Sequence, residues 1–490
     1  MPMELEANAV ADALPCAMAR SWQKTFARDV MLFASANLLY LGITAVTTFV
    51  LPRVVSVRTF GLYRLFLLFA GYVGILHIGT LDGALVRWAD DPTTRIRREV
   101  PAVVVFMSLV ELAILFPACL IAFIVANRIV AWMLLAIAII ALATNATSLG
   151  QYVLQAAKRF RRLSLLTVLM PAVLLLSVIG LAVAHRADTL TVVSAALFTN
   201  LVIAIGYAIS VRGQIDWKWP SAAKAWGLAK IHIHIGFAIM LTNFFANLIV
   251  SADRLFVTAK FSIENFAIYS FAGTIFYSVN LMVLSVSKVV FPYLVRDIAH
   301  DRHNVAFRLG HKTVLALWSL GMASYFPLHW LVLRILPKYA SSLPLIRILI
   351  IGTGASALVQ ILHFNFFRVY HLGRRMLVGT IIGLVMMLGI LFTVQSYGKM
   401  DLLAMGMVAG VTCWWAANEV LLRDRVERSG WAILLDLSLM VLVAGGYIAA
   451  SSRVSLFNCG LYFIGACGFT WWIIPRSAFN ALKHRLTASH

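Results

Sequence analysis

Seven charged side chains lie in or beside long apolar runs of this sequence, and they are its first candidates for chemistry. They are the basic residues Arg64, Arg254, Lys288 and Arg347 and the acidic residues Asp82, Glu111 and Asp253. An ionisable group at the centre of a membrane helix costs about 2.5–3.5 kcal/mol on insertion scales, so such groups normally face protein or water. The bases could bind an anion, whereas the acids could pair with an arginine, gate a movement or bind a coupling proton.

Each of the bases also has a structural explanation. Arg64 lies about five residues into its apolar run, Lys288 lies late in its run, and Arg347 lies early in its run. All three could therefore extend their long side chains to the membrane surface. Asp253 and Arg254 are adjacent at the end of a run, where they could form an interfacial ion pair or anchor a helix end.

The other acids leave similar alternatives open. Glu111 lies near the middle of an apolar run, where a structural pair explains it nearly as well as a proton site or an arginine partner. Asp82 lies in HIGTLDGALVRW with His77 one turn earlier, and a plain helix break at the glycines explains this stretch equally well. His232, at the start of a later run, is expected at the membrane interface.

The composition indicates that the solvent of this chain is a bilayer. Of 490 residues 61% are hydrophobic and only 12% are charged, and the mean hydropathy is +0.89. A soluble fold could not bury so much apolar side chain. The net charge of +21 would suggest a nucleic-acid partner for a soluble protein. Here the bases gather between apolar runs, so the positive-inside rule explains them and no nucleic acid is expected.

About fourteen apolar runs have the length that crosses a bilayer, roughly 18–25 residues. Their approximate ranges are 30–51, 59–79, 100–126, 129–153, 163–184, 190–211, 233–254, 266–288, 313–333, 343–366, 376–396, 402–422, 432–450 and 455–474. The predicted fold is an all-α integral membrane protein of about 14 transmembrane helices. Basic residues mark alternate connections, which predicts that both termini are cytoplasmic. Because no connection exceeds about 25 residues, no soluble catalytic domain and no enzyme activity are expected.

An internal repeat appears when the sequence is shifted by 206 residues. VRTFGLYRLFLLFAGY (57–72) then lies over IENFAIYSFAGTIFYS (263–278). The repeat predicts two six-helix lobes in the same orientation with two further helices outside. The predicted segments are a cytoplasmic N-terminal tail (1–29), the first lobe (30–211), a cytoplasmic linker (212–231), the second lobe (232–422), helices 13 and 14 (423–474) and a cytoplasmic C-terminal tail (475–490).

No cofactor is predicted from the motifs of the chain. Its five cysteines include no pair at C-x-x-C spacing, so they are interpreted as small core residues and no metal site is expected. No G-x-x-x-x-G-K-[ST] sequence occurs, so no ATP-binding loop of that type is expected.

The segment SADRLFVTAKFSIENFAIYSFAGTIFYSVNLMVLSVSKVVFPYLVRD (251–297) resembles the centre of the Wzx-type bacterial polysaccharide flippases. These belong to the polysaccharide transporter family of the multidrug/oligosaccharidyl-lipid/polysaccharide exporter (MOP) superfamily. The similarity is carried by Ala252-Asp253-Arg254, Ala267-Ile268-Tyr269 and Phe291-Pro292, with Ala267 at a position where glycine is common in the family. Further similar stretches are FGLYRLFLLFAGYVGILHIGTLDGALVRW (60–88), LQAAKRFRRLSLL (154–166) and ILPKYASSLPLIRIL (335–349).

The resemblance implies a MATE-like two-lobed bundle that works by alternating access around a central cavity. The implied role is to move an undecaprenyl-diphosphate-linked oligosaccharide to the periplasmic leaflet of the bacterial inner membrane, in O-antigen, capsule or exopolysaccharide synthesis. The four bases would contact this anionic substrate, and the three acids would serve in coupling or gating. Membrane lipids and a polysaccharide polymerase or export machinery are the other implied partners. The alternatives are a MATE-type multidrug or cation antiporter and an integral-membrane glycosyltransferase or polymerase.

Overall fold

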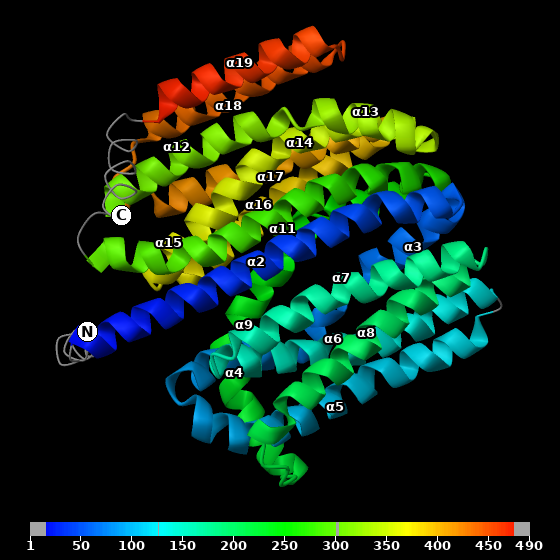
Figure 1. The fold of residues 1–490 in the computed structure, drawn as a ribbon, viewed down its shortest axis with the longest axis vertical. Helices are drawn as coiled ribbons and strands as arrows, with labels where there is room; N and C mark the ends of the chain where they lie inside the picture. The colour runs from blue at the N-terminus through cyan, green and yellow to red at the C-terminus, as the bar shows by residue number, and fades with distance from the viewer. Residues whose placement is uncertain (1–15, 126, 300–302, 475–490) are drawn as a thin grey trace.

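The computed structural model describes residues 16–125, 127–299 and 303–474, and these residues form helices and short connections without a β-strand (Figure 1). Fourteen of the helical segments in this described part are long and apolar enough to cross a membrane. This confirms the prediction of an all-α membrane protein with about fourteen spans. The predicted C-terminal tail (475–490) and the first half of the predicted N-terminal tail lie outside the described residues.

The long helices follow one another with short helical pieces between them. The long helices are α2 (Cys16–Val54), α3 (Val57–Ala70), α5 (Pro92–Ile124), α6 (Arg128–Ala156), α7 (Phe160–Val183), α8 (Thr189–Val211), α9 (Ala222–Ile249), α11 (Ile263–Ala299), α12 (His303–Met322), α14 (Leu343–Ala357), α16 (Gly373–Val394), α17 (Met400–Leu422), α18 (Gly430–Ser451) and α19 (Leu456–Ile473). The short pieces are α4 (Thr80–Asp90), α10 (Ala252–Lys260), α13 (Tyr325–Ile335), α15 (Phe364–Val369), η1 (Val73–His77), η2 (Arg212–Gln214), η3 (Pro337–Ser342), the π-helical η4 (Leu358–His363) and η5 (Gln395–Tyr397).

Polar residues at the ends of the apolar runs set where several helices begin. The Ser56 side chain accepts a hydrogen bond from the Thr59 backbone N–H at the start of α3. The Asn127 side chain accepts hydrogen bonds from backbone N–H groups at the start of α6. Asp188 forms a capping box with Thr191 at the start of α8. A side-chain oxygen at this position satisfies one of the backbone N–H groups that have no partner inside the helix. The connections can therefore be short, because each helix is terminated locally.

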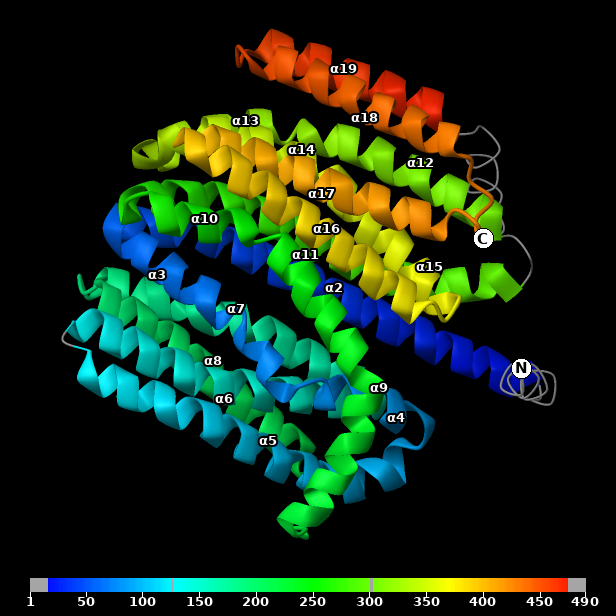
Figure 2. The ribbon, with the colours of Figure 1, turned by 180° about the vertical axis from the view of Figure 1, so that it is seen from behind.

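The helices form two packed groups with α9 between them. In the first group α5, α6, α7 and α8 pack side by side, and in the second group α11, α14, α16 and α17 do so (Figures 1 and 2). Helix α9 packs against α4 and α5 on one side and against α16 on the other. Helices α18 and α19 pack against each other and contact α12 at the outer edge of the second group.

The two groups meet where α3 crosses α11. A Cβ atom placed on Gly61 would lie 2.5 Å from the backbone oxygen of Ile263 and 3.2 Å from the Cβ of Ala267. Gly61 and Ala267 are equivalent positions under the 206-residue shift. In a two-fold arrangement, a residue close to the axis contacts its own equivalent. If the predicted internal repeat holds, its axis would pass close to this crossing.

A second close crossing joins α4 to α9. Gly79, which has φ +77°, caps α4, and Gly83 lies one turn later. A Cβ on Gly236 of α9 would lie 2.1 Å from the Gly79 oxygen, and one on Gly83 would lie 1.9 Å from the oxygen of His232. Gly79 thus breaks the helix before Asp82, as the sequence allowed, and Gly79 and Gly83 permit backbone contact between α4 and α9.

Gly236→Ala is expected to destabilise the protein by about 1–3 kcal/mol, because the new methyl group has no space beside the α4 backbone. Gly227→Ala is the matched control in the same helix, since no atom lies within 4 Å of a Cβ built at that position. Thermal unfolding of the purified variants in detergent measures both. Equal transition temperatures for the two variants would contradict the close crossing.

Candidate functional site

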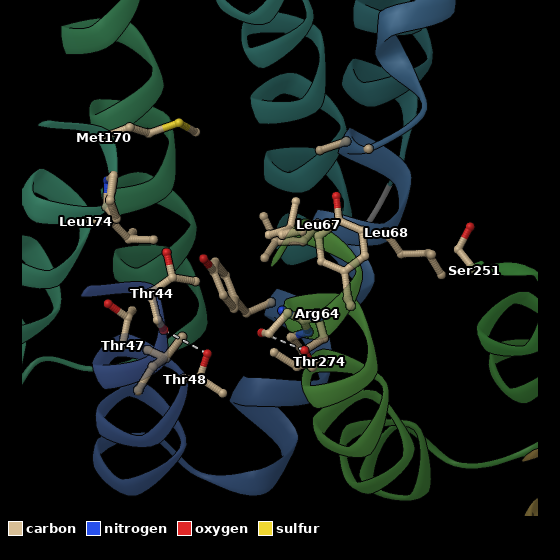
Figure 3. Close-up of a pocket in the computed structure, with 18 of the residues that line it drawn as sticks. Thr44, Thr47, Thr48, Arg64, Leu67, Leu68, Met170, Leu174, Ser251 and Thr274 are labelled. Carbon is tan, nitrogen blue, oxygen red and sulfur yellow. Dashed lines mark hydrogen bonds between the residues drawn. The ribbon is translucent and has the colours of Figure 1, made fainter. Parts of the chain in front are cut away.

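A cavity of about 520 Å³ lies at the junction of the two groups of helices (Figure 3). Its wall is built from α2, α3, α6, α7 and α8 of the first part of the chain and from α9, α10 and α11 of the second. Helices α2, α3 and α11 form the corner at which the two groups touch. The cavity therefore borders the surface along which the two halves would have to separate.

Arg64 of α3 lines this cavity and carries an uncompensated charge. Its side chain is partly buried, and its Nε atom has no hydrogen-bond partner among the described residues. No acidic side chain in the described part of the chain forms an ion pair with it. The Arg64 position follows from α3, which begins at the Ser56 cap and buries Phe60 and Tyr63 on adjoining turns. A guanidinium held this way presents its donors to any anion that enters the cavity.

Arg254 lines the same cavity from the other half of the chain. It is only 8% exposed, and its guanidinium donates to the backbone oxygen of Val250 at 3.1 Å. Two positive charges, one from each half of the chain, therefore share the wall of this cavity. The cavity thus brings together two of the four bases that the sequence singled out.

Asp253 holds the start of α10 in place and does not line the cavity. Its carboxylate accepts from the Arg254 backbone N–H at 2.8 Å and from the Tyr269 hydroxyl at 2.8 Å. Burial raises the pKa of the Asp253 carboxyl, while the Arg254 charge and the Tyr269 hydrogen bond act in the opposite direction. No direct side-chain ion pair joins Asp253 and Arg254 within the described structure, so the interfacial ion pair that the sequence allowed is not formed. Asp253 instead ties α10 to α11 beside the Arg254 side chain.

Uncharged polar side chains complete the cavity wall, and sequence reasoning missed most of them. Thr44, Thr47 and Thr48 of α2 lie on its inner side in Figure 3. Further hydroxyl and amide groups come from Tyr40, Tyr72, Thr144, Asn200, Asn247, Ser251, Thr274, Tyr277 and Ser278. The detectable signal was the i, i+3, i+4 spacing of threonines in the apolar run 30–51, which puts them on one helix face. These groups supply hydrogen bonds without adding charge.

The cavity wall is basic as a whole. Arg64 and Arg254 are its charged lining residues, and no Asp or Glu of the described chain lines it. Hydrophobic side chains such as Leu51, Leu174 and Leu281 cover much of the remaining surface. Two cations in a partly apolar enclosure attract an anion more strongly than they would in water, because the local dielectric is lower. The arrangement is suited to a hydroxyl-rich, negatively charged ligand.

The other two predicted bases do not join this group in the described structure. Arg347, in α14, lies near α18 and approaches the Ser451 backbone oxygen at 3.5 Å, and it does not line the cavity. Lys288 lies in the described helix α11, but its side chain is outside the described residues. The structure therefore supports cavity positions for Arg64 and Arg254 and places Arg347 elsewhere.

The remaining acids lie away from the two arginines. Glu111 of α5 accepts a hydrogen bond from the Asn145 amide of α6 at 2.6 Å, which is a structural pair between two helices. Asp82 of α4 accepts from the Tyr152 hydroxyl at 3.5 Å, and its carboxylate lies 3.7 Å from His77 Nε2. Burial raises the pKa of Asp82 to about 6. Neither carboxylate lines the cavity.

Two buried carboxylates that were not predicted each contact a histidine and an arginine. Glu99 accepts from Arg87 at 2.9 Å and lies 3.1 Å from His232 Nε2, which joins α4, α5 and α9. The His232 side chain is completely buried in the protein. In the second group Glu419 lies 2.6 Å from His363 Nε2 and 3.2 Å from Arg428 Nε. These sites pair their charges internally and stabilise the two helix groups.

Among the described residues no group of three or more His, Cys, Asp or Glu side chains could hold a metal ion. Four of the cysteines are described, and each of these is free. The polar groups that line the cavity are guanidinium, hydroxyl and amide groups.

Solved membrane transporters share this fold. The lipid II flippase MurJ in an inward closed conformation superposes with a TM-score of 0.63 at 9% identity, covering 94% of this chain and 100% of MurJ. An inward-facing multidrug resistance MATE family transporter of the MOP superfamily gives 0.54 at 14% identity, over 80% and 94% of the two chains. A MOP superfamily transporter from Pyrococcus furiosus, described as having a binding pocket of reverse polarity, gives 0.55 at 12% identity, over 81% and 95%.

The sequence also matches the model of a protein family. A family model described as polysaccharide biosynthesis protein matches residues 50–322, which is more than half of the chain. No curated protein sequence matches the chain. The matched range contains both cavity arginines and the α3 and α11 crossing.

Tyr269→Phe is expected to lower the free energy of unfolding by roughly 1–3 kcal/mol, because the buried Asp253 carboxylate loses a hydrogen-bond donor. Tyr397→Phe removes the same hydroxyl from a residue that is 70% exposed, and it serves as the control. Thermal unfolding in detergent compares the two variants. A transition temperature for Tyr269→Phe as high as that of the control would show that the buried hydrogen bond contributes little.

Proposed function

The chain belongs to the polysaccharide biosynthesis protein family, and from this premise we propose that it is a flippase for an oligosaccharide linked to a lipid diphosphate. The protein would carry the sugar and its phosphates from one leaflet to the other through the cavity between its two halves. The MATE-like fold supports this proposal, because its two groups of helices can alternate in exposing a central cavity.

The observation that carries the proposal is the pair of arginines in the cavity wall. Arg64 and Arg254 come from different halves and lack an acidic partner on the wall. A lipid diphosphate carries negative charge on both phosphates, and guanidinium groups bind such oxygens with directed, charge-assisted hydrogen bonds. A ligand that contacts both arginines would bridge the two halves, so its binding can be coupled to their movement.

The polar, uncharged groups of the wall suit the sugar part of this substrate. Thr44, Thr47 and Thr48 line the cavity from one helix face, and the hydroxyls of Thr47 and Thr48 donate to backbone oxygens of their own helix. Such hydroxyls keep acceptor capacity for the hydroxyl groups of a sugar. Amide groups of Asn200 and Asn247 add donors at other points of the wall.

A cation antiporter of the MATE type is supported less well by this cavity. Such a transporter would be expected to place carboxylates at the cation site, whereas the described lining residues include two arginines and no Asp or Glu. The solved proteins that share the fold are transporters and a flippase rather than enzymes. An integral-membrane glycosyltransferase therefore has no support from the family or the fold.

We extend the proposal to the membrane, the orientation and the biosynthetic process in which the transport takes place. We place the protein in a bacterial inner membrane with both termini in the cytoplasm, and we assign it to O-antigen, capsule or exopolysaccharide synthesis. Movement would run from the cytoplasmic to the periplasmic leaflet, where a polysaccharide polymerase or export machinery would use the product. The charge bias of the connections supports the orientation.

Leaflet exchange in liposomes tests the proposed function. The purified protein would be reconstituted with a fluorescent undecaprenyl-diphosphate sugar, and a membrane-impermeant quencher would follow the labelled sugar over time. Protein-free liposomes give the spontaneous rate, and a fluorescent cationic drug tests the antiporter alternative. Faster exchange of the diphosphate sugar is the expected result. A rate equal to that of protein-free liposomes, or movement of the cation alone, would refute the proposal.

Arg64→Gln and Arg254→Gln are each expected to slow this exchange by roughly tenfold or more, since each removes a charge-assisted contact to phosphate. Arg347→Gln is the matched control, because it removes an arginine that lies in another part of the helix bundle. Reconstituted protein amounts are equalised by quantitative gel analysis. Unchanged exchange rates in both cavity variants would remove these arginines from the substrate path.

A further inference from the structure

A second hollow, polar and separate from the central cavity, lies where α6 turns into α7 and where α8 ends. Its volume is about 450 Å³, and its wall includes Arg159, Arg162 and Arg212 together with Gln214. These residues lie at the ends of three candidate membrane spans, Arg128–Ala156, Phe160–Val183 and Thr189–Gln214. The hollow is therefore at the level where membrane helices leave the hydrocarbon and reach the headgroups.

The backbone around the hollow is well determined by hydrogen bonds. The turn after α6 has Lys158 at φ 54°, with the Lys158 N–H bonded to the Gln155 oxygen and the Arg159 N–H bonded to the Leu154 oxygen. This pair of bonds is the Schellman motif that ends many helices. It fixes the point at which Arg159 leaves the α6 axis. The hollow is thus built on a defined turn rather than on a loose connection.

The second wall is tied to the first by an arginine. Arg162, in the first turn of α7, donates from Nη1 to the Ser210 backbone oxygen at the end of α8, at 2.9 Å. This bond uses one donor of a guanidinium that has five. Arg212 follows directly in η2, so the ends of α7 and α8 present their cations to the same space.

The positive charges of this hollow have no acidic partner in the described structure. Arg159 and Arg212 form no hydrogen bond or ion pair through their side chains with any described residue, and no Asp or Glu lines the hollow. Asp216, the acid next in sequence, lies 3.8 Å from Lys218 instead. The Gln214 Nε2 atom is buried without a hydrogen-bond partner among the described residues. Three guanidinium groups and a free amide donor match the acceptor oxygens of a phosphate.

An apolar surface leads away from the hollow along α7 and α8. Leu165 and Leu169 lie one turn apart on α7, and Ile205 and Ile209 lie one turn apart on α8, and all four are exposed. Ile209 also lines the hollow. In a membrane these side chains face lipid, so an acyl chain attached to a phosphate in the hollow would lie against them.

Two tryptophans follow Gln214 within five residues of the sequence. Trp217 and Trp219 are exposed, and their ring centroids are 5.5 Å apart in the connection that follows η2. Tryptophan is enriched at membrane interfaces, where its ring lies among the headgroups. A phosphate between this connection and the α7 and α8 surface would have the position of a lipid headgroup.

We propose that this hollow is a binding site for the phosphate headgroup of an anionic phospholipid, whose acyl chains cover the outer surface of α7 and α8. The site lies on the face that the sequence predicts to be cytoplasmic. The proposal does not depend on the transported substrate, because none of its residues lines the central cavity. The bound lipid would stabilise the end of the α7 and α8 pair within the first group of helices.

Native mass spectrometry of the full-length protein in detergent tests the site. Phosphatidylglycerol and the zwitterionic phosphatidylcholine, with the same acyl chains, are titrated against the protein. Arg159→Gln/Arg212→Gln is expected to weaken phosphatidylglycerol binding roughly 30-fold, since each base near a membrane surface contributes on the order of 1 kcal/mol. Arg162 is kept, because its bond to Ser210 ties the two helices. Arg128→Gln/Arg186→Gln, at the opposite ends of α6 and α7, is the matched control and is expected to bind like the unaltered protein.

Three possible outcomes distinguish this lipid site from the alternatives. Arg64→Gln/Arg254→Gln is expected to retain phosphatidylglycerol binding, and loss of binding in that variant would place the lipid in the central cavity and overturn the proposal. Equal losses in the test and control variants would mean unspecific attraction to basic residues and would also overturn it. Displacement of the lipid by millimolar inorganic phosphate would identify a site for free phosphate instead of a lipid. Circular dichroism and thermal unfolding verify that each variant is folded.

Discussion

A charge inside a hydrocarbon layer must find a partner or water, and this constraint organises the structure of the protein. Most buried carboxylates meet it within the chain, as Glu99 does with His232 and as Glu419 does with His363. These internal pairs hold helices together and leave no charge for a ligand. Arg64 meets the constraint differently, because it lines a cavity and forms no ion pair with an acidic residue of the described structure. The contrast between paired and unpaired charges separates the structural polar groups from the candidate site.

The number and type of helices could be predicted from the sequence because hydrophobic length is a local property. A run of about twenty apolar residues has few stable forms other than a membrane helix, since the backbone must satisfy its own hydrogen bonds in lipid. The positions of Arg64 and Arg254 as unusual charges were visible for the same reason. The family resemblance around residues 251–297 implied a MATE-like bundle; the family match confirms the resemblance, and the solved transporters that share the fold confirm the MATE-like fold.

Which way a side chain faces could not be read from the apolar runs. Arg347 interrupts its run much as Arg64 does, yet it lies towards α18 rather than the cavity. The approach of His232 to Glu99 depends on how α9 crosses α4 and α5, over a separation of 133 residues. Hydropathy contains no information on such crossings. The α2 threonines were detectable as a helix face, but their spacing alone does not distinguish a cavity wall from a helix contact.

The crossing of α3 and α11 limits how the chain can vary. Gly61 and Ala267 touch each other and are equivalent in the internal repeat, so they share one small volume between the two halves. The methyl group at this contact belongs to Ala267, because a Cβ atom on Gly61 would also lie 2.5 Å from the backbone oxygen of Ile263. The two positions are therefore not interchangeable: the α3 position requires glycine, and the α11 position requires a small side chain. A larger side chain at either position would force α3 and α11 apart and so loosen the contact between the two halves, since this closely packed space cannot hold further atoms.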